Sequence, residues 1–70
     1  MTLDKIKKIV RESLGISHLF RFRGARNQIE EFEGVITDLY PSIFIVTTNN
    51  NVVRSFTYSD LLIANLEIVD

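Results

Sequence analysis

Arginines and phenylalanines alternate in the stretch FRFR, which runs from residue 20 to residue 23. Bases can stack on aromatic rings while cations contact phosphates, so this interleaving forms a nucleic-acid surface when both kinds of side chain share a face. In a β-strand, successive side chains point to opposite faces, so Arg21 and Arg23 lie opposite Phe20 and Phe22. We therefore expect the phenylalanines in the core and the arginines outside it.

Glutamates in the following stretch, IEEFEGVITDLY, can pair with these arginines. Glu31 and Glu33 fall on one face of the predicted strand and alternate with core residues. One antiparallel register satisfies the charges and the core together. Its pairs are Phe22 with Phe32, Arg23 with Glu31, Arg21 with Glu33, and Phe20 with Gly34. We favour this ion-paired interpretation and keep partner or nucleic-acid binding by Arg21 and Arg23 as the alternative.

A predicted loop holds a second pair of candidates for binding. Arg26 and Asn27 follow the turn-forming Gly24 and have no obvious internal partner. Loop residues that a rigid scaffold positions are good candidates for binding, and an arginine can hold a phosphate or a carboxylate with two parallel hydrogen bonds. The competing interpretation is a solvated turn. We expect Arg26 and Asn27 to contact a protein or nucleic-acid partner.

The N-terminal segment MTLDKIKKIVRES adds a basic cluster on a predicted helix. Its cations are Lys5, Lys7, Lys8 and Arg11. Such a cluster is most often a solvated helix face, but it can also attract an acidic partner or a nucleic acid. We include Lys5 and Lys8 among the candidate binding residues and keep the solvated face as the alternative.

Catalysis is not expected from this sequence. The chain has no cysteine and a single histidine, His18, so it offers no thiolate nucleophile and too few ligands for a metal site. Glu31 and Glu33 would lie about 7 Å apart along a strand, a spacing that suits paired carboxylates. A domain of this size offers no evident cleft, so we interpret the pair as a solvated face. We predict a protein that is not an enzyme and has no cofactor.

The net charge of −1 conceals a strong asymmetry along the chain. Residues 1–26 carry seven of the eight basic side chains and two acidic ones, whereas residues 27–70 carry one basic and seven acidic side chains. This division indicates either a basic binding face or two parts that neutralise each other on folding. No stretch approaches the roughly 18 apolar residues of a membrane span, so we expect a cytoplasmic protein that does not bind membranes.

Apolar residues recur at helical spacing near the N-terminus and at alternate positions after it. The spacing predicts a helix over residues 3–14, with Thr2 as its N-terminal cap and Gly15 in the left-handed conformation after its end. A single helical turn over residues 58–62, capped by Ser59 or Asp60, precedes the last strand. The alternation predicts five strands. They cover residues 18–24, 29–40, 43–48, 52–58 and 63–70.

Five short antiparallel strands close most easily into a small barrel. Gly34 within the second strand suggests the bulge or bend of a tightly curved sheet, and Pro41 ends that strand. A helical turn before the last strand is typical of SH3-like and Sm-like barrels. We predict a mainly β fold, a small SH3-like or Sm-like five-stranded antiparallel barrel with an N-terminal α-helix. Residues 1–70 form a single domain, with the helical segment at 1–15 and the barrel at 18–70.

Two motifs within this framework resemble those of a known family. Residues 24–46 read GARNQIEEFEGVITDLYPSIFIV, with a tyrosine–proline–serine turn, and residues 54–62 read RSFTYSDLL. With the N-terminal helix, these segments resemble the Veg family of small bacterial proteins over nearly the whole chain. The resemblance implies a cytoplasmic protein with a small barrel that stimulates biofilm formation by opposing a repressor of matrix-gene transcription. It implies no enzyme activity.

From these observations we expect a regulatory protein that works by protein–protein contact, with a transcriptional repressor or its regulator as the partner. The limited core and the open edge strands of a small barrel favour self-association, with a dimer as the preferred state. The alternative is an Sm-like module that binds RNA or DNA with an affinity that falls steeply with salt. Its contacts would come from Lys5, Lys8, Arg21, Arg23 and Arg26.

Overall fold

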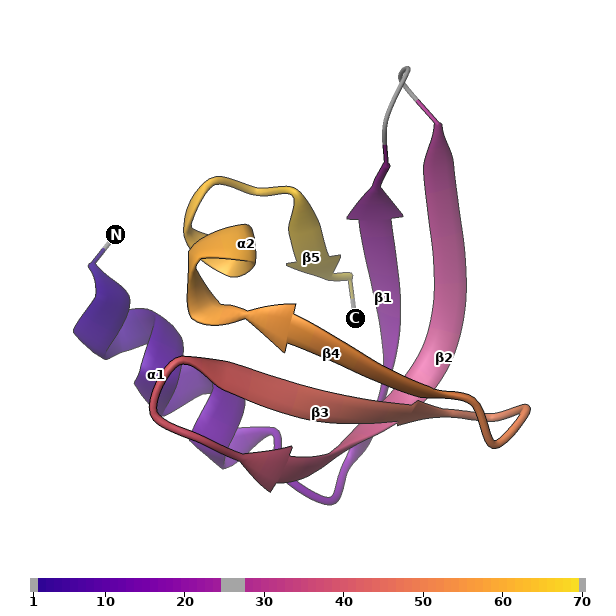
Figure 1. Cartoon of the computed structure of the whole chain (residues 1–70), viewed down its shortest axis with the longest axis horizontal. Coiled ribbons are helices and arrows are strands. Elements are labelled where there is room, and N and C mark those ends of the chain that lie inside the picture. Colours follow the sequence, from indigo (N-terminus) through magenta and orange to yellow (C-terminus); the bar gives the residue numbers. More distant parts are fainter. Residues whose placement is uncertain (1, 25–27, 70) are drawn as a thin grey trace.

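The computed structural model describes residues 2–24 and 28–69. Its elements are, in order, α1 (Leu3–Glu12), β1 (Ser17–Arg23), β2 (Ile29–Leu39), β3 (Ile43–Thr48), β4 (Val53–Thr57), α2 (Tyr58–Leu62) and β5 (Leu66–Ile68) (Figure 1). The five strands form one antiparallel sheet in the order β4-β3-β2-β1-β5. The predicted mainly β fold with an N-terminal helix is confirmed.

Local sequence sets both ends of α1. The side-chain oxygen of Thr2 accepts a hydrogen bond from the backbone N–H of Lys5 at 3.4 Å, which satisfies one of the free donors of the first turn. Gly15 has a φ of +78°, the left-handed conformation predicted for it. The helix ends at Glu12, two residues earlier than predicted. Its buried residues, Ile6 and Val10, pack into the common core.

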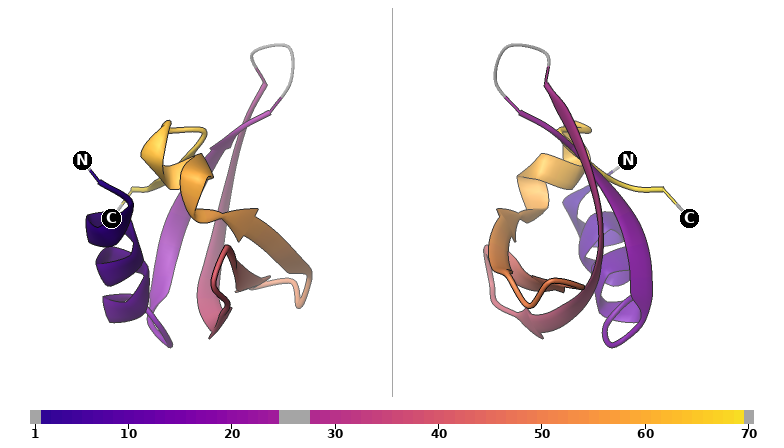
Figure 2. Two further views of the ribbon diagram at one scale, coloured as in Figure 1. Left: turned by 60° about the vertical axis from the view of Figure 1, so that its left-hand side comes forward. Right: turned by 90° about the vertical axis from the view of Figure 1, so that its right-hand side faces the viewer.

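The sheet is strongly curled, so that strands distant in the sheet order approach each other. Figure 2 shows β3 and β4 turning across the direction of β1 and β2, with α1 packed beside the curled sheet. The ring of Phe56 on β4 lies 5.4 Å from that of Phe22 on β1, measured between centroids. It also stacks on Phe32 of β2 at 6.0 Å. Because β3 separates β4 from β2, these contacts cross the concave side of the sheet.

Gly34 permits the close approach of β2 and β3. A Cβ atom at this position would lie 2.7 Å from Cγ1 of Val46 and 3.1 Å from the backbone oxygen of Thr47. Real Cβ atoms essentially never come that near to a neighbour, so glycine is required here for packing. The ladder irregularity lies elsewhere, between Ile36 and Asp38. The bulge suggested at Gly34 is therefore displaced toward the end of the strand.

The predicted register between β1 and β2 is wrong by two residues. Phe20, not Phe22, lies opposite Phe32, and the two rings stack with centroids 5.5 Å apart. The predicted place for Phe20 was opposite Gly34, but the space over that glycine is filled by Val46. A shift of two residues keeps every side chain on its predicted face. The core assignments consequently hold, and the partners of the arginines change.

Burial alternates along β3. Phe44 and Val46 are fully buried, whereas Ile43 and Ile45 on the outer face are half-buried. Pro41 lies in the bend after β2, as predicted. The outer face of β3 is therefore only partly covered.

The helical turn α2 has the predicted range, but its cap lies two or three residues earlier than predicted. Thr57, not Ser59 or Asp60, is the N-terminal cap, and its side chain accepts a hydrogen bond from the backbone N–H of Asp60 at 3.1 Å. The carboxylate of Asp60 accepts in return from the backbone N–H of Thr57 at 3.0 Å. This capping box turns the chain away from β4 and toward β5.

The two ends of the sheet are strands β4 and β5, which are not paired with each other. Ring contacts across the concave side join β4 to β1 and β2 without a hydrogen-bonded ladder. Closure into an SH3-like or Sm-like barrel therefore stays a prediction. The described helices and strands share one hydrophobic core, to which α1, α2 and all five strands contribute.

Candidate functional site

The two arginines of β1 form ion pairs on the outer face of the sheet. Arg21 Nη2 lies 2.9 Å from Glu31 Oε2 on β2, and Arg23 Nη2 lies 3.2 Å from Glu67 Oε1 on β5. The favoured interpretation, pairing with glutamates, is confirmed, although the partners predicted were Glu33 and Glu31 respectively. These pairs are partly exposed, so each adds little stability. They do reduce the positive charge that Arg21 and Arg23 could offer a ligand.

Arg54 on β4 occupies a place that sequence reasoning did not foresee. Its guanidinium carbon lies 5.6, 4.8 and 5.2 Å from the ring centroids of Phe22, Phe32 and Phe56. Its Nη1 donates a hydrogen bond of 2.7 Å to Glu30 Oε1 on β2. A cation held over aromatic faces is attracted by their ring quadrupoles. Arg54 thus joins β4 to β1 and β2 across the open side of the curled sheet.

The cations of α1 differ from those of the sheet, because none of them forms an ion pair with another described residue. Lys5 and Lys8 are exposed. Lys7 is half-buried and its Nζ lies 5.5 Å from the ring centroid of Tyr58. Arg11 follows Lys7 by four residues, so the two side chains share one helix face. Of the four cations, only Lys7 and Arg11 line the groove between α1, the turn after β2 and the start of α2.

Two adjoining cavities form a surface that we call the helix–turn groove. One cavity of about 290 Å³ lies between α1, the turn after β2 and the start of α2. A second cavity of about 180 Å³ adjoins it and shares three of its residues. The lining residues of the two are Leu3, Lys7, Arg11, Leu39, Tyr40, Pro41, Ser42, Tyr58 and Ser59. Both motifs that suggested the family therefore meet α1 in this groove, through the tyrosine–proline–serine turn and through Tyr58 and Ser59 of the second motif.

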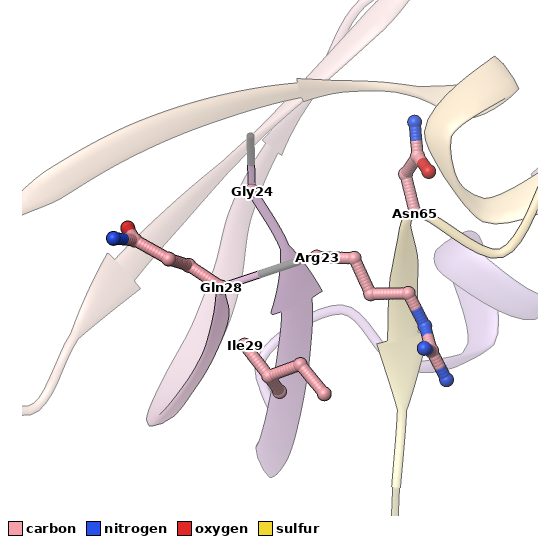
Figure 3. A pocket seen from close by; sticks show the side chains of 5 residues that line it. All are labelled: Arg23, Gly24, Gln28, Ile29 and Asn65. Atoms are coloured by element: carbon pink, nitrogen blue, oxygen red, sulfur yellow. The ribbon is translucent and has the colours of Figure 1, made fainter. Parts of the chain in front are cut away.

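A third cavity lies at the base of the β1–β2 hairpin. It has a volume of about 310 Å³ and is lined by Arg23, Gly24, Gln28, Ile29 and Asn65. Figure 3 shows these side chains pointing in different directions instead of converging on one point. Arg23 is also engaged with Glu67. The described residues of this cavity are therefore not arranged to hold a ligand.

The remaining candidates contribute little to a site. Arg26 and Asn27 lie outside the described residues, so their predicted binding role stays a prediction. Glu31 is committed to Arg21. His18 packs edge-on against Phe20, with centroids 6.4 Å apart. Among residues 2–24 and 28–69, no group of three or more histidines and carboxylates is placed to hold a metal ion. No described helix has the length and apolar character needed to cross a membrane.

Sequence reasoning did not identify the helix–turn groove. Lys7 and Arg11 were recognised only as members of a basic cluster, and Tyr40 and Pro41 only as a family motif. Lys7 and Arg11, four residues apart, share a helix face, but spacing alone does not separate them from Lys5 and Lys8, because Lys8 and Arg11 are also neighbours on the helix surface. Which element that face meets depends on contacts between residues more than 25 positions apart.

Comparison with known proteins agrees with the motifs. No curated protein matches the sequence significantly. The sequence model of one family, described as biofilm formation stimulator VEG, matches residues 1–69 of the 70-residue chain. The match includes α1, both motifs and every strand of the curled sheet. The chain therefore belongs to the VEG family of biofilm formation stimulators.

Proposed function

We propose that this chain is a non-enzymatic regulator in the bacterial cytoplasm that stimulates biofilm formation through an effect on transcription. It acts by protein–protein contact, with a transcriptional repressor or a regulator of that repressor as its partner. Membership of the family supports the link to biofilm formation. The ion pairs of Arg21 and Arg23 support protein contact over a nucleic-acid surface on the sheet.

The observation that carries the proposal is the open edge of β4. The backbone N–H of Thr57 points away from β3, because it donates to the carboxylate of Asp60. Residues of an antiparallel strand alternate between bonding to the neighbouring strand and pointing away from it. Val53 and Ser55 therefore also present their N–H and C=O groups outward, as does any strand at the end of a sheet. This edge can accept another strand.

The two edges of the sheet differ in how they are protected. At the other end, β5 has only three residues and carries Glu67, and short, charged edges discourage further pairing. β4 has no proline, and its one charged residue, Arg54, is turned inward onto Phe32 and Glu30. Val53 is 66% exposed beside this edge. An unprotected edge of this kind pairs readily, and an antiparallel strand of a second copy would present matching groups.

A dimer formed through β4 is the assembly that this edge supports. Sedimentation at micromolar concentration should give a dimer of the 8.1 kDa chain. Ser55→Lys should shift the population to monomer, since it puts like charges beside each other across the dimer edge. Thr37→Lys, at an exposed position on the central strand β2, adds the same charge and should leave the dimer intact. A wild-type protein that sediments only as monomer would rule out self-association.

The effect on transcription is tested in a biofilm-forming bacterium that lacks its own family member. Expression of the chain should restore matrix-gene transcripts, measured by quantitative PCR, when the matrix repressor is present. In a strain that also lacks the repressor, transcripts should be high with or without the chain. Equal stimulation of the transcripts in the two strains would show that the protein does not act through the matrix repressor.

One observation favours the second candidate function, nucleic-acid binding: the cations of α1 have no ion-pair partner among the described residues. Nucleic-acid binding of this kind falls steeply with salt because phosphate counterions are released. Fluorescence anisotropy with labelled RNA and DNA oligonucleotides at low salt tests it. Absence of binding under these conditions eliminates the Sm-like alternative.

A further inference from the structure

The helix–turn groove is built around a fixed tyrosine. Tyr58 is 6% exposed, and its hydroxyl donates a hydrogen bond of 2.8 Å to the backbone oxygen of Tyr40. Its ring packs on Phe44 in the core, with centroids 5.4 Å apart. The ammonium group of Lys7 lies over the same ring. Tyr58 therefore joins the start of α2 to the turn after β2 and holds the floor of the groove in place.

The charges that line the groove are of one sign. Among its lining residues only Lys7 and Arg11 are charged, and both are cations without an ion-pair partner among the described residues. They lie four residues apart on the helix, about 6 Å along its axis, which is close to the spacing of about 7 Å between alternate carboxylates of an extended peptide. Beside them, Tyr40 is 52% exposed and Leu3 is 42% exposed. The groove thus combines two cations with uncovered apolar surface.

We propose that the helix–turn groove holds an acidic segment of the protein partner. Two carboxylates of that segment bind Lys7 and Arg11, and an apolar side chain covers Tyr40 and Pro41. Charge complementarity of this type steers a partner and fixes its position. The inference rests on the proposed function, contact with a protein, and assigns that contact a surface and a chemistry.

A peptide fits this site better than a nucleic acid. A bound strand of nucleic acid needs a track of cations along its backbone and rings on which its bases stack. Beyond the groove, the described arginines of the sheet are taken up by Glu30, Glu31 and Glu67. Lys5 and Lys8 on the same helix are exposed but do not line the groove, so the groove itself offers two cations, which suits a few carboxylates.

The probe for the test is a hexaglutamate peptide capped at both ends, titrated into ¹⁵N-labelled protein at low salt. Amide resonances of Lys7, Arg11 and Tyr40 should shift and saturate with millimolar affinity. A capped hexaglutamine peptide of the same length should cause no such shifts. A six-nucleotide oligothymidylate forms the third arm, and it should bind more weakly than hexaglutamate.

Matched charge reversals locate the binding. The Lys7→Glu/Arg11→Glu double variant should bind hexaglutamate about tenfold more weakly. Lys5→Glu/Lys8→Glu makes the same change of net charge at exposed positions outside the groove and should lower the affinity less than about threefold. Circular dichroism checks that both variants are folded. Tyr40→Ala, which removes the ring and its hydroxyl without changing the charge, should weaken the binding of a glutamate peptide that carries a central phenylalanine more than that of hexaglutamate.

Three results would overturn the inference. The first is absence of shifts at the groove with hexaglutamate. The second is an equal loss of affinity in the two charge-reversal variants, which would indicate attraction by overall charge. The third is tighter binding of oligothymidylate through the same residues. None of these results affects the transcription test, so the proposal for the groove can be wrong while the proposed function stands.

Discussion

The basic side chains of the sheet and those of α1 differ in what surrounds them. Arg21, Arg23 and Arg54 each contact a glutamate on another strand, at 2.9, 3.2 and 2.7 Å. Lys7 and Arg11 contact no described carboxylate and line a groove instead. The comparison separates cations that stabilise the sheet from cations that remain available to a partner. Residue type and charge count alone do not make this distinction.

The comparison also explains the charge asymmetry of the chain. Neutralisation on folding is confirmed for the two arginines of β1, whereas a basic binding face stays a prediction. Arg21 and Arg23 come from the basic part and are neutralised by Glu31 and Glu67 of the acidic part. The cations of α1 are not neutralised in this way. Among the described residues, the unpaired basic side chains are therefore concentrated on one helix, which is the kind of localised field that attracts an acidic partner.

The largest loss of stability is expected at Gly34, where the sheet depends on close packing instead of charge. Gly34→Ala should lower the free energy of unfolding by about 3 kcal/mol, because the added Cβ collides with Val46 and with the backbone of β3. Urea denaturation measures the change. Gly24→Ala is the matched control, since a Cβ there meets only ordinary contacts. Equal midpoints for the two variants would show that β2 and β3 are farther apart than described.

Arg54 is expected to contribute most among the sheet cations. Arg54→Ala should lower the free energy of unfolding by about 2 kcal/mol, because it removes a cation from three ring faces and leaves those rings uncovered. Arg54→Lys keeps the charge but not the planar stacking, and should fall between wild type and alanine. A lysine variant as unstable as the alanine variant would mean that the charge itself contributes nothing.

The two ion pairs on the outer face should contribute much less. Glu31→Gln and Glu67→Gln should each lower the free energy of unfolding by about 0.5 kcal/mol, since these pairs are partly exposed to water. The difference from wild type should shrink further in 1 M salt, because exposed charges are screened. Thermal unfolding with and without salt measures it. A loss above 2 kcal/mol that salt does not reduce would indicate a structural role beyond ion pairing.

The smallest effect on stability is expected for the helix cations. Arg11→Gln should change the free energy of unfolding by less than about 0.5 kcal/mol, because its side chain is exposed and makes no ion pair with a described residue. The same urea titration measures it beside Arg54→Ala. If Arg11→Gln proved as destabilising as Arg54→Ala, the distinction between the two groups of cations would be lost.

Local patterns predicted the elements and their faces because these follow from spacing alone. The helix, the alternation in FRFR and the turn at Pro41 all depend on neighbours in sequence. The register of β1 and β2 does not, since two registers that differ by two residues place the same side chains in the core. The choice between them depends on Val46, which fills the space over Gly34 and is supplied by a third strand.

The site was harder to predict than the fold for the same physical reason. A pair such as Arg21–Glu31 could be anticipated, because a hairpin brings nearby residues together, whereas Arg23 pairs with Glu67 on β5, 44 positions away. Arg54 could not be matched with Glu30, since the curl of the whole sheet brings β4 toward β2. The meeting of α1 with Tyr40 and Tyr58 likewise depends on how the helix packs on the finished sheet. Long-range contacts of this type leave little trace in sequence spacing.

The central claim is that the two groove cations, and not the positive charge of α1 in general, carry the contact that stimulates biofilm formation. Complementation of a biofilm-forming bacterium that lacks its own family member tests this most directly, with biofilm mass as the readout and immunoblots to confirm equal protein levels. We predict that wild type and Lys5→Glu/Lys8→Glu restore the biofilm and that Lys7→Glu/Arg11→Glu does not. Full restoration by the Lys7→Glu/Arg11→Glu variant would contradict the account.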